Sequence, residues 1–249
     1  MDGRDKAGHD GDRVEAVVAK LKVMCARSMH VAVGALGEAF AQGSGHEIAF
    51  DFGTVGALQG KLDAGETADV VILSVPGIDK LEQAGALIAG SRKNIAKTFI
   101  ALCIREGAPR PDFSTMEAFK RLLENARAIA TSDPAVGGSA GVHLAKTFEQ
   151  TGLAAMMATK SMPQQSGVEV ARRVVEGKAE FGLTLSGEVA SVAGAMIAGP
   201  LPSPFGQDTT YCAAVMAGSD AKEAALAFIA ALTRPHTRTT WAKAGFELP

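Results

Sequence analysis

The sequence has few cysteines and few aromatic residues, and both shortages narrow the classes of protein it can belong to. The three cysteines, Cys25, Cys103 and Cys212, lie far apart, and no CxxC or Cys/His ligand spacing occurs. We therefore expect no metal site, and we interpret the cysteines as small buried hydrophobic residues. Aromatic residues make up only 5% of the chain, which leaves little surface for stacking single-stranded nucleic acids.

An excess of positive charge and a long apolar run are also missing. The net charge is −2 and the pI is about 6.2, so we expect no nucleic-acid partner. No stretch has the length and apolar character of a transmembrane helix. The first residues, MDGRDKAGHDGDR, lack the apolar centre of a secretory signal. We expect residues 1–19 to form a disordered leader.

Apolar residues, by contrast, are abundant, and their pattern alternates between strands and helices. They make up 47% of 249 residues, enough for one large domain or two lobes. Short apolar runs at 21–26, 46–52 and 68–73 each precede a helical pattern, and this order repeats along the chain. The alternation predicts an α/β fold with parallel strands and helices on both faces. MATKSMP, at 157–163, is interpreted as strand-like.

Two longer strand-like runs suggest how the chain is divided. They lie at 97–107 and 209–218, and we interpret crossings near 97–107 and 200–212 as links between two lobes. Lobe 1 then comprises residues 20–100 and 206–249, and lobe 2 comprises residues 101–205. We expect the strands not to form a single continuous sheet.

The segment SDPAVGGSAGVHLAK (132–146) combines a glycine-rich turn with the start of a helix. Its glycines allow the backbone to approach a ligand closely, and the free N–H groups of the helix attract negative charge. Ser28 is expected to cap the first long helix in a similar position after a strand. These features permit an anion site without requiring one.

Several segments together resemble the type II periplasmic solute-binding proteins, and among them the molybdate-binding-protein-like group. They are LKVMCARSM, FDFGTVGALQGKLDAGETADVVIL, SDPAVGGSAGVHLAK, VEGKAEFGLTLSGEV and TTYCAAVMAGS, so that the likeness covers roughly residues 20–249. It implies two doubly wound α/β lobes that close over a small anionic ligand, without a cofactor. It also implies a periplasmic monomer that delivers its ligand to the membrane subunits of an ABC transporter, although a cytoplasmic location stays open because no signal peptide is seen.

By position, this resemblance assigns the ligand to turns that follow the strands of both lobes. The residues carried over are Arg27, Ser28, Met29, Gly53, Thr54, Val55, Gly137, Gly138, Ser139, Ser166, Gly167 and Thr184.

The chain departs from molybdate binders at two of these turns. Arg27 stands where they carry small hydroxyl residues, and Leu185 stands where they tend to carry a tyrosine. A forked guanidinium matches a carboxylate, so we expect a carboxylate ligand rather than molybdate.

Three functions therefore remain open. The first is a solute-binding protein for a carboxylate or oxyanion. The second is an isomerase of an unsaturated polycarboxylate, because proteins that this chain resembles isomerise aconitate. In that case His143 or His30 would be the base. The third is a cytosolic ligand sensor. Glu188 and Asp69 are interpreted as structural residues near strand ends. Binding is the favoured function, because we see no second acid–base group at a defined spacing.

Overall fold

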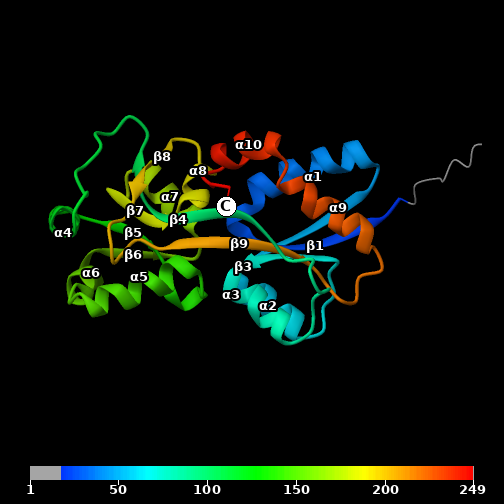
Figure 1. The fold of residues 1–249 in the computed structure, drawn as a ribbon. Coiled ribbons are helices and arrows are strands. Elements are labelled where there is room, and N and C mark those ends of the chain that lie inside the picture. Colours follow the sequence, from blue (N-terminus) through cyan, green and yellow to red (C-terminus); the bar gives the residue numbers. More distant parts are fainter. Residues whose placement is uncertain (1–17, 249) are drawn as a thin grey trace, which may run out of the picture.

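The computed structural model describes residues 18–248, in which two α/β lobes lie side by side (Figure 1). Residues 1–17, most of the predicted leader, lie outside the described part of the chain. Lobe 1 is built on the strands β1 (Lys20–Ala26), β2 (Glu47–Gly53), β3 (Val70–Ser74) and β9 (Asp208–Val215). Lobe 2 is built on β5 (Ile129–Ser132), β6 (Ser161–Gln164), β7 (Phe181–Leu185) and β8 (Ala195–Pro200).

Helices cover both faces of the strands in each lobe. In lobe 1 they are α1 (His30–Ser44), α2 (Val55–Asp63), α3 (Val75–Gln83), α9 (Lys222–Leu232) and α10 (Arg238–Lys243). In lobe 2 they are α4 (Met116–Asn125), α5 (Ser139–Gln150), α6 (Ala154–Lys160), α7 (Gly167–Val175) and α8 (Ser186–Ala190). Short 3-10 turns occur at η1 (Arg27–Met29), η2 (Pro134–Val136) and η3 (Pro235–Thr237).

The strands of lobe 1 are apolar on both faces because each face packs against a different group of helices. Successive side chains of a strand point to opposite faces. Val70 and Ile72 of β3 accordingly join the core that also contains Phe228 of α9, whereas Val71 and Leu73 join a second core with residues of α2 and α3. The resulting layers are the doubly wound arrangement that the sequence predicted.

The strand β4 (Lys93–Arg105) belongs to both lobes (Figure 1). Its first half pairs antiparallel with β9, as far as Phe99, and its second half pairs with β7 and β8 from Ile100 onwards. The hydrogen-bonded path β2-β1-β3-β9-β4-β7-β5-β6 is therefore continuous. The expectation that the strands would not form one continuous sheet is wrong, because a 13-residue strand is long enough to pair in both lobes. The two lobes therefore have separate hydrophobic cores, although hydrogen bonds join their strands into one sheet.

The predicted lobe ranges stay a prediction, which the change of partner between Phe99 and Ile100 supports at one boundary. Two local interpretations were incorrect. Residues 157–160 of the predicted strand-like segment 157–163 belong to helix α6, and only its residues 161–163 lie in strand β6. Ser28 does not cap α1, because Met29 occupies the capping position and Ser28 lies inside η1.

Candidate functional site

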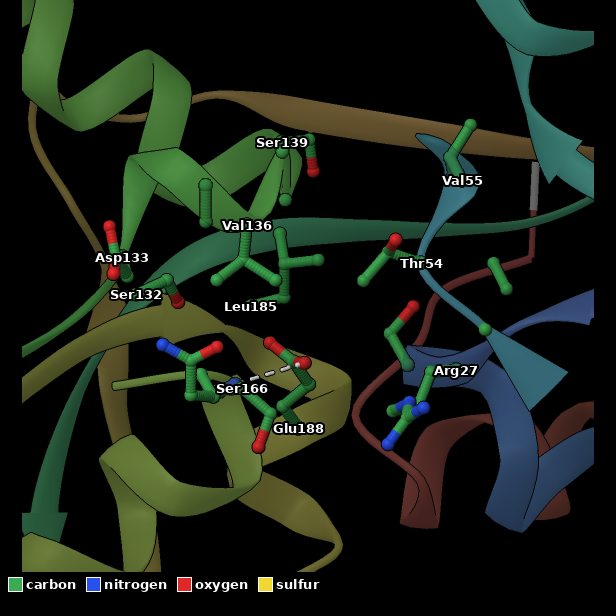
Figure 2. Close-up of a pocket in the computed structure, with 18 of the residues that line it drawn as sticks. Arg27, Thr54, Val55, Ser132, Asp133, Val136, Ser139, Ser166, Leu185 and Glu188 are labelled. Atoms are coloured by element: carbon green, nitrogen blue, oxygen red, sulfur yellow. Dashed lines mark hydrogen bonds between the residues drawn. The ribbon is translucent and has the colours of Figure 1, made fainter. Parts of the chain in front are cut away.

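A cavity of about 300 Å³ lies between the two lobes, and Figure 2 shows the side chains around it. The residues that line it come from both lobes and from ten or more separate positions along the chain. They are Ala26, Arg27, Ser28, Gly53, Thr54, Val55, Ser132, Asp133, Val136, Gly137, Gly138, Ser139, Ala140, Gln164, Gln165, Ser166, Gly167, Leu185, Glu188 and Tyr211.

Most of these residues follow the carboxyl end of a parallel strand. Arg27 follows β1, Thr54 follows β2, Asp133 follows β5 and Gln165 follows β6, while Leu185 is the last residue of β7. In open α/β sheets the carboxyl ends of parallel strands are the usual place for a ligand. The order of strands along the chain thus brings distant turns to one cavity.

The helices that begin at the cavity differ in how their first N–H groups are used. Thr54 Oγ1 accepts from Ala57 N at 3.1 Å in α2, and Ser166 Oγ accepts from Glu169 N at 3.3 Å in α7. The capping position of α5 is Gly138, and no side chain caps that helix. Gly137 before it has φ of 74°, a conformation that favours glycine. The start of α5 therefore offers uncapped N–H donors to the cavity.

Two hydroxyl groups form a buried pair on the lobe 1 side. Ser28 Oγ and Tyr211 Oη lie 2.8 Å apart, and the two residues are only 9% and 2% exposed. Burial raises the pKa of the Tyr211 phenol, so it stays protonated. Because the pair shares one hydrogen, the other hydroxyl hydrogen remains free to be donated to a bound group.

The two charged groups of greatest interest face the cavity from opposite lobes (Figure 2). The Arg27 side chain is exposed, and it forms no ion pair with another residue of the range 18–248. Glu188, on α8, is partly buried in lobe 2: Oε2 accepts from Thr184 Oγ1 at 2.7 Å, and Oε1 accepts from Gly167 N at 3.2 Å.

The surroundings of Glu188 shift the pKa of its carboxyl group upward, as the balance of opposing causes. Desolvation raises the pKa of this carboxyl, although the hydrogen bonds from Thr184 and Gly167 and the charge of Arg27 oppose that rise. A carboxyl group with a raised pKa in a cavity can donate a proton as well as accept one. The interpretation of Glu188 as only a structural residue was therefore incomplete. Asp69, by contrast, does hold a strand, because its Oδ2 accepts from Lys22 N at 2.8 Å.

Ten of the twelve predicted ligand residues line the cavity, and two do not. Met29 is fully buried in the core of lobe 1, where its side chain packs against the residues of β1 and α1. Thr184 is also fully buried, and it reaches the cavity only through its hydrogen bonds to Glu188 and Ser132.

Neither histidine that the sequence suggested as a base lines this cavity. His30 Nδ1 lies 3.0 Å from the Arg27 carbonyl oxygen, and its ring borders a neighbouring cavity. His143 lies in the second turn of α5, where its Nε2 is 3.1 Å from the Pro204 carbonyl oxygen. Helix α5 points its other face to the cavity, which accounts for the position of His143.

Sequence reasoning missed Tyr211 and undervalued Glu188. Tyr211 is the sole tyrosine of the chain, and its strand β9 pairs with β3 so that it lies opposite Ser74. A lone tyrosine in the middle of a long strand was the available signal. For Glu188, the signal was its place four residues after Thr184, immediately after a strand that ends at the cavity.

Residues 18–248 contain neither a cluster of metal ligands nor a helix that could span a membrane. No group of three or more His, Cys, Asp or Glu side chains is placed to hold a metal ion in that range. None of its helices has both the length and the apolar character needed to cross a membrane.

Comparison with known proteins gave matches over most of the chain. A family profile described as bacterial extracellular solute-binding protein matches residues 21–247. An aconitate isomerase from Pseudomonas sp. is 34% identical over 177 residues, which is 70% of this chain and 64% of that protein. The chain thus spans less than two thirds of the length of this curated relative.

Solved structures with the same fold have low sequence identity. The substrate-binding domain of a putative molybdenum ABC transporter from Clostridium difficile has a TM-score of 0.74 and 17% identity, covering 93% of this chain and 99% of that one. The periplasmic molybdate-binding protein of Azotobacter vinelandii has a TM-score of 0.71 and 20% identity, covering 92% and 99%. A sulfate-binding protein from Mycobacterium tuberculosis has a TM-score of 0.70 and 18% identity, covering 92% and 87%.

Proposed function

Since the chain belongs to the family of bacterial extracellular solute-binding proteins, we propose that it binds a small anion in the cavity between its lobes. The observation that carries the proposal is the pairing of Arg27, which has no ion-pair partner among residues 18–248, with the uncapped start of α5 across the same cavity. A guanidinium and free backbone N–H groups are the donors that anion sites use.

The chemistry of these donors favours a carboxylate among the small anions. The guanidinium of Arg27 presents two parallel N–H bonds that fit the two oxygens of a carboxylate. The Ser28–Tyr211 pair adds one hydroxyl donor, and Leu185 adds an apolar surface on the lobe 2 side. A ligand with a carboxylate at one end and carbon atoms beyond it would use all three.

A ligand screen tests this proposal directly. The purified protein is heated with sulfate, molybdate, citrate, cis-aconitate or trans-aconitate, and each hit is measured by calorimetry. A ligand at about 100 times its dissociation constant adds about 2.7 kcal/mol of stability, which raises the melting temperature by several degrees. We expect the largest shift from a carboxylate. No shift with any of these anions would contradict the proposal.

A second candidate is the isomerisation of an unsaturated polycarboxylate such as aconitate, and Glu188 is the observation that favours it. The reaction moves a double bond along a carbon chain. A base removes a proton from one carbon, the released electron pair forms the new double bond, and the electrons of the old one take a proton at the far carbon. No other reactant is needed, and one carboxyl group can remove and return the proton. The relative named aconitate isomerase supports the same proposal.

This second candidate assigns the proton transfer to Glu188 rather than to the histidines. Incubation with cis-aconitate or trans-aconitate, followed by chromatography, measures turnover. Turnover that is lost in Glu188→Gln but kept in His30→Ala and His143→Ala would support it. Turnover that Glu188→Gln leaves unchanged would exclude Glu188 as the base, and binding without turnover would leave only the first candidate.

The cellular context follows from the family as part of the same proposal. We propose that the protein acts as a monomer in the periplasm and hands its ligand to the membrane subunits of an ABC transporter. A cytosolic sensor is the alternative. Fractionation of the native host, with sequencing of the mature N-terminus, distinguishes the two.

A further inference from the structure

We infer that Glu188 takes up one proton when the cavity binds an anion, so that anion and proton enter the site together. The inference rests on the proposed anion binding and deepens it; it does not rest on the isomerisation, for which Glu188 has to be ionised while the ligand is bound. It assigns a role to a partly buried carboxyl group that recognition of a negative charge does not require.

The position of Glu188 is fixed by close packing. Its carboxyl group lies against Gly167 so closely that a Cβ atom at residue 167 would overlap Glu188 Oε2 and Thr184 Oγ1. The hydrogen bonds from Thr184 Oγ1 and Gly167 N hold its two oxygens. The carboxyl group therefore cannot swing away when a second negative charge arrives.

No cation forms an ion pair with this carboxyl group among residues 18–248. The lining of the cavity contains one guanidinium, that of Arg27, and two carboxyl groups, those of Asp133 and Glu188. The phenol of Tyr211, on β9, also lines the cavity and stays neutral. Helix α7, which packs on α8, carries Glu169 and Arg172, and both of these border the neighbouring cavity instead.

An anion bound among these groups therefore meets more negative than positive charge in the lining of the cavity. Two like charges in a poorly solvated cavity repel strongly, and a proton bound to Glu188 removes that repulsion. Desolvation already raises the pKa of Glu188, and a bound anion raises it further. Uptake of a proton is thus the route by which the site accommodates the ligand.

Protonation also adds a donor to the cavity. The neutral carboxyl group has an O–H that can be donated to an oxygen of the anion. Thr184 Oγ1 keeps a partner, because it lies 3.2 Å from Ser132 Oγ and either hydroxyl can donate. Ser132 itself lines the cavity, so the hydroxyl groups can reorient without leaving a buried oxygen unpaired.

Calorimetry with two buffers of different ionisation enthalpy tests the inference, because the dependence of the observed heat on the buffer counts the protons taken up. The probes are sulfate, which carries no proton of its own at neutral pH, and trans-aconitate. For the wild type we expect uptake approaching one proton per bound anion, and affinity that rises up to about tenfold for each unit of decrease in pH. Glu188→Gln should bind without proton uptake and with little pH dependence.

Glu176→Gln is the matched control, since Glu176 is exposed at the end of α7 and pairs with Lys178. It should take up the same proton as the wild type. Binding by the wild type without proton uptake, or uptake that persists in Glu188→Gln, would overturn the inference while leaving anion binding intact. Absence of binding for every probe would instead remove the proposed function and, with it, this inference. If Glu188→Gln does not fold, the buffer dependence of the wild type alone decides.

Discussion

The two lobes line the cavity with different kinds of chemical group. Lobe 1 contributes a cation, Arg27, and the hydroxyl pair of Ser28 and Tyr211. Lobe 2 contributes backbone N–H groups at the start of α5, but its charged lining residues are the acids Asp133 and Glu188. For the anion binding proposed above, the difference leads us to expect that attraction and selection are divided: lobe 1 attracts negative charge, and lobe 2 selects the anion whose charge it can neutralise or satisfy.

This division also separates exposed from buried chemistry. Arg27 is exposed, so its charge is screened by water and acts on ligands before they are enclosed. Glu188 is only partly exposed and desolvation raises its pKa, so we expect its charge to be less screened and to act on a ligand enclosed in the cavity. The variants below remove these features one at a time, and they are ordered from the largest expected effect to the smallest.

Gly167→Ala should damage the lobe 2 wall most. The added Cβ overlaps Glu188 Oε2 and Thr184 Oγ1, so the carboxyl group or helix α7 must shift. We expect a loss of about 1–3 kcal/mol in the free energy of unfolding, the usual cost of overpacking, together with loss of anion binding. Urea denaturation and calorimetry measure the two. Gly60→Ala in α2 is the control, because no atom lies within 4 Å of its added Cβ and Gly60 does not line the cavity; equal losses in the two variants would contradict the packing argument.

Arg27→Ala should weaken the attraction of lobe 1. We expect the affinity for a carboxylate ligand to fall about tenfold, or about 1.4 kcal/mol. This loss is modest because the guanidinium of Arg27 is exposed to solvent. Titration calorimetry measures it. Arg110→Ala removes an exposed arginine from a loop of lobe 2 that does not line the cavity, and it should leave affinity unchanged. Equal affinity of Arg27→Ala and the wild type would exclude Arg27 from the site.

Tyr211→Phe tests the hydroxyl pair. The variant leaves Ser28 Oγ, which is buried, without its 2.8 Å partner. We expect a loss of about 1 kcal/mol in the free energy of unfolding, the usual net worth of one hydrogen bond. The double variant Ser28→Ala with Tyr211→Phe should lose less than the sum of the single variants, because it leaves no unpaired hydroxyl. Strict additivity in urea denaturation would argue against the pair.

The pH dependence of stability should show the smallest effect. The pKa of Glu188 is raised in the folded protein by desolvation. A carboxyl group of this kind stabilises the fold fully below its unfolded pKa, about 4.3, and that contribution is lost as the pH rises through the folded pKa. We therefore expect Glu188→Gln to gain stability relative to the wild type as the pH rises above about 4.3. Parallel pH profiles in denaturation experiments would mean that Glu188 titrates normally.

Much of the site was predictable because its main parts are local. Strands with apolar runs, such as 21–26, ended where the pattern indicated, and the turns after them supplied Arg27, Thr54 and Gly138 to the cavity. Such features depend on residues within a few positions of one another, so periodicity and turn chemistry find them.

The errors share a different cause. Ser28 was expected to cap a helix, but its hydroxyl instead pairs with Tyr211, which is 183 residues away. Segment 157–163 was interpreted as strand-like, but its residues 157–160 belong to helix α6, which packs Met157 into the core with Phe148. In both cases a tertiary contact outweighed a local preference, which a short window of sequence cannot register.

The sequence by itself determined the alternation of strands and helices, the turns that open toward a ligand and the single cation among them. Only the tertiary structure decided which acid the cavity contains. Glu188 reaches it because α8 packs against the start of α7, where the absence of a side chain on Gly167 admits the carboxyl group. Tyr211 reaches it because the register of β9 against β3 sets it opposite Ser74. The ionisation of a group depends on its three-dimensional surroundings, and those surroundings come from segments that the chain brings together only when it folds.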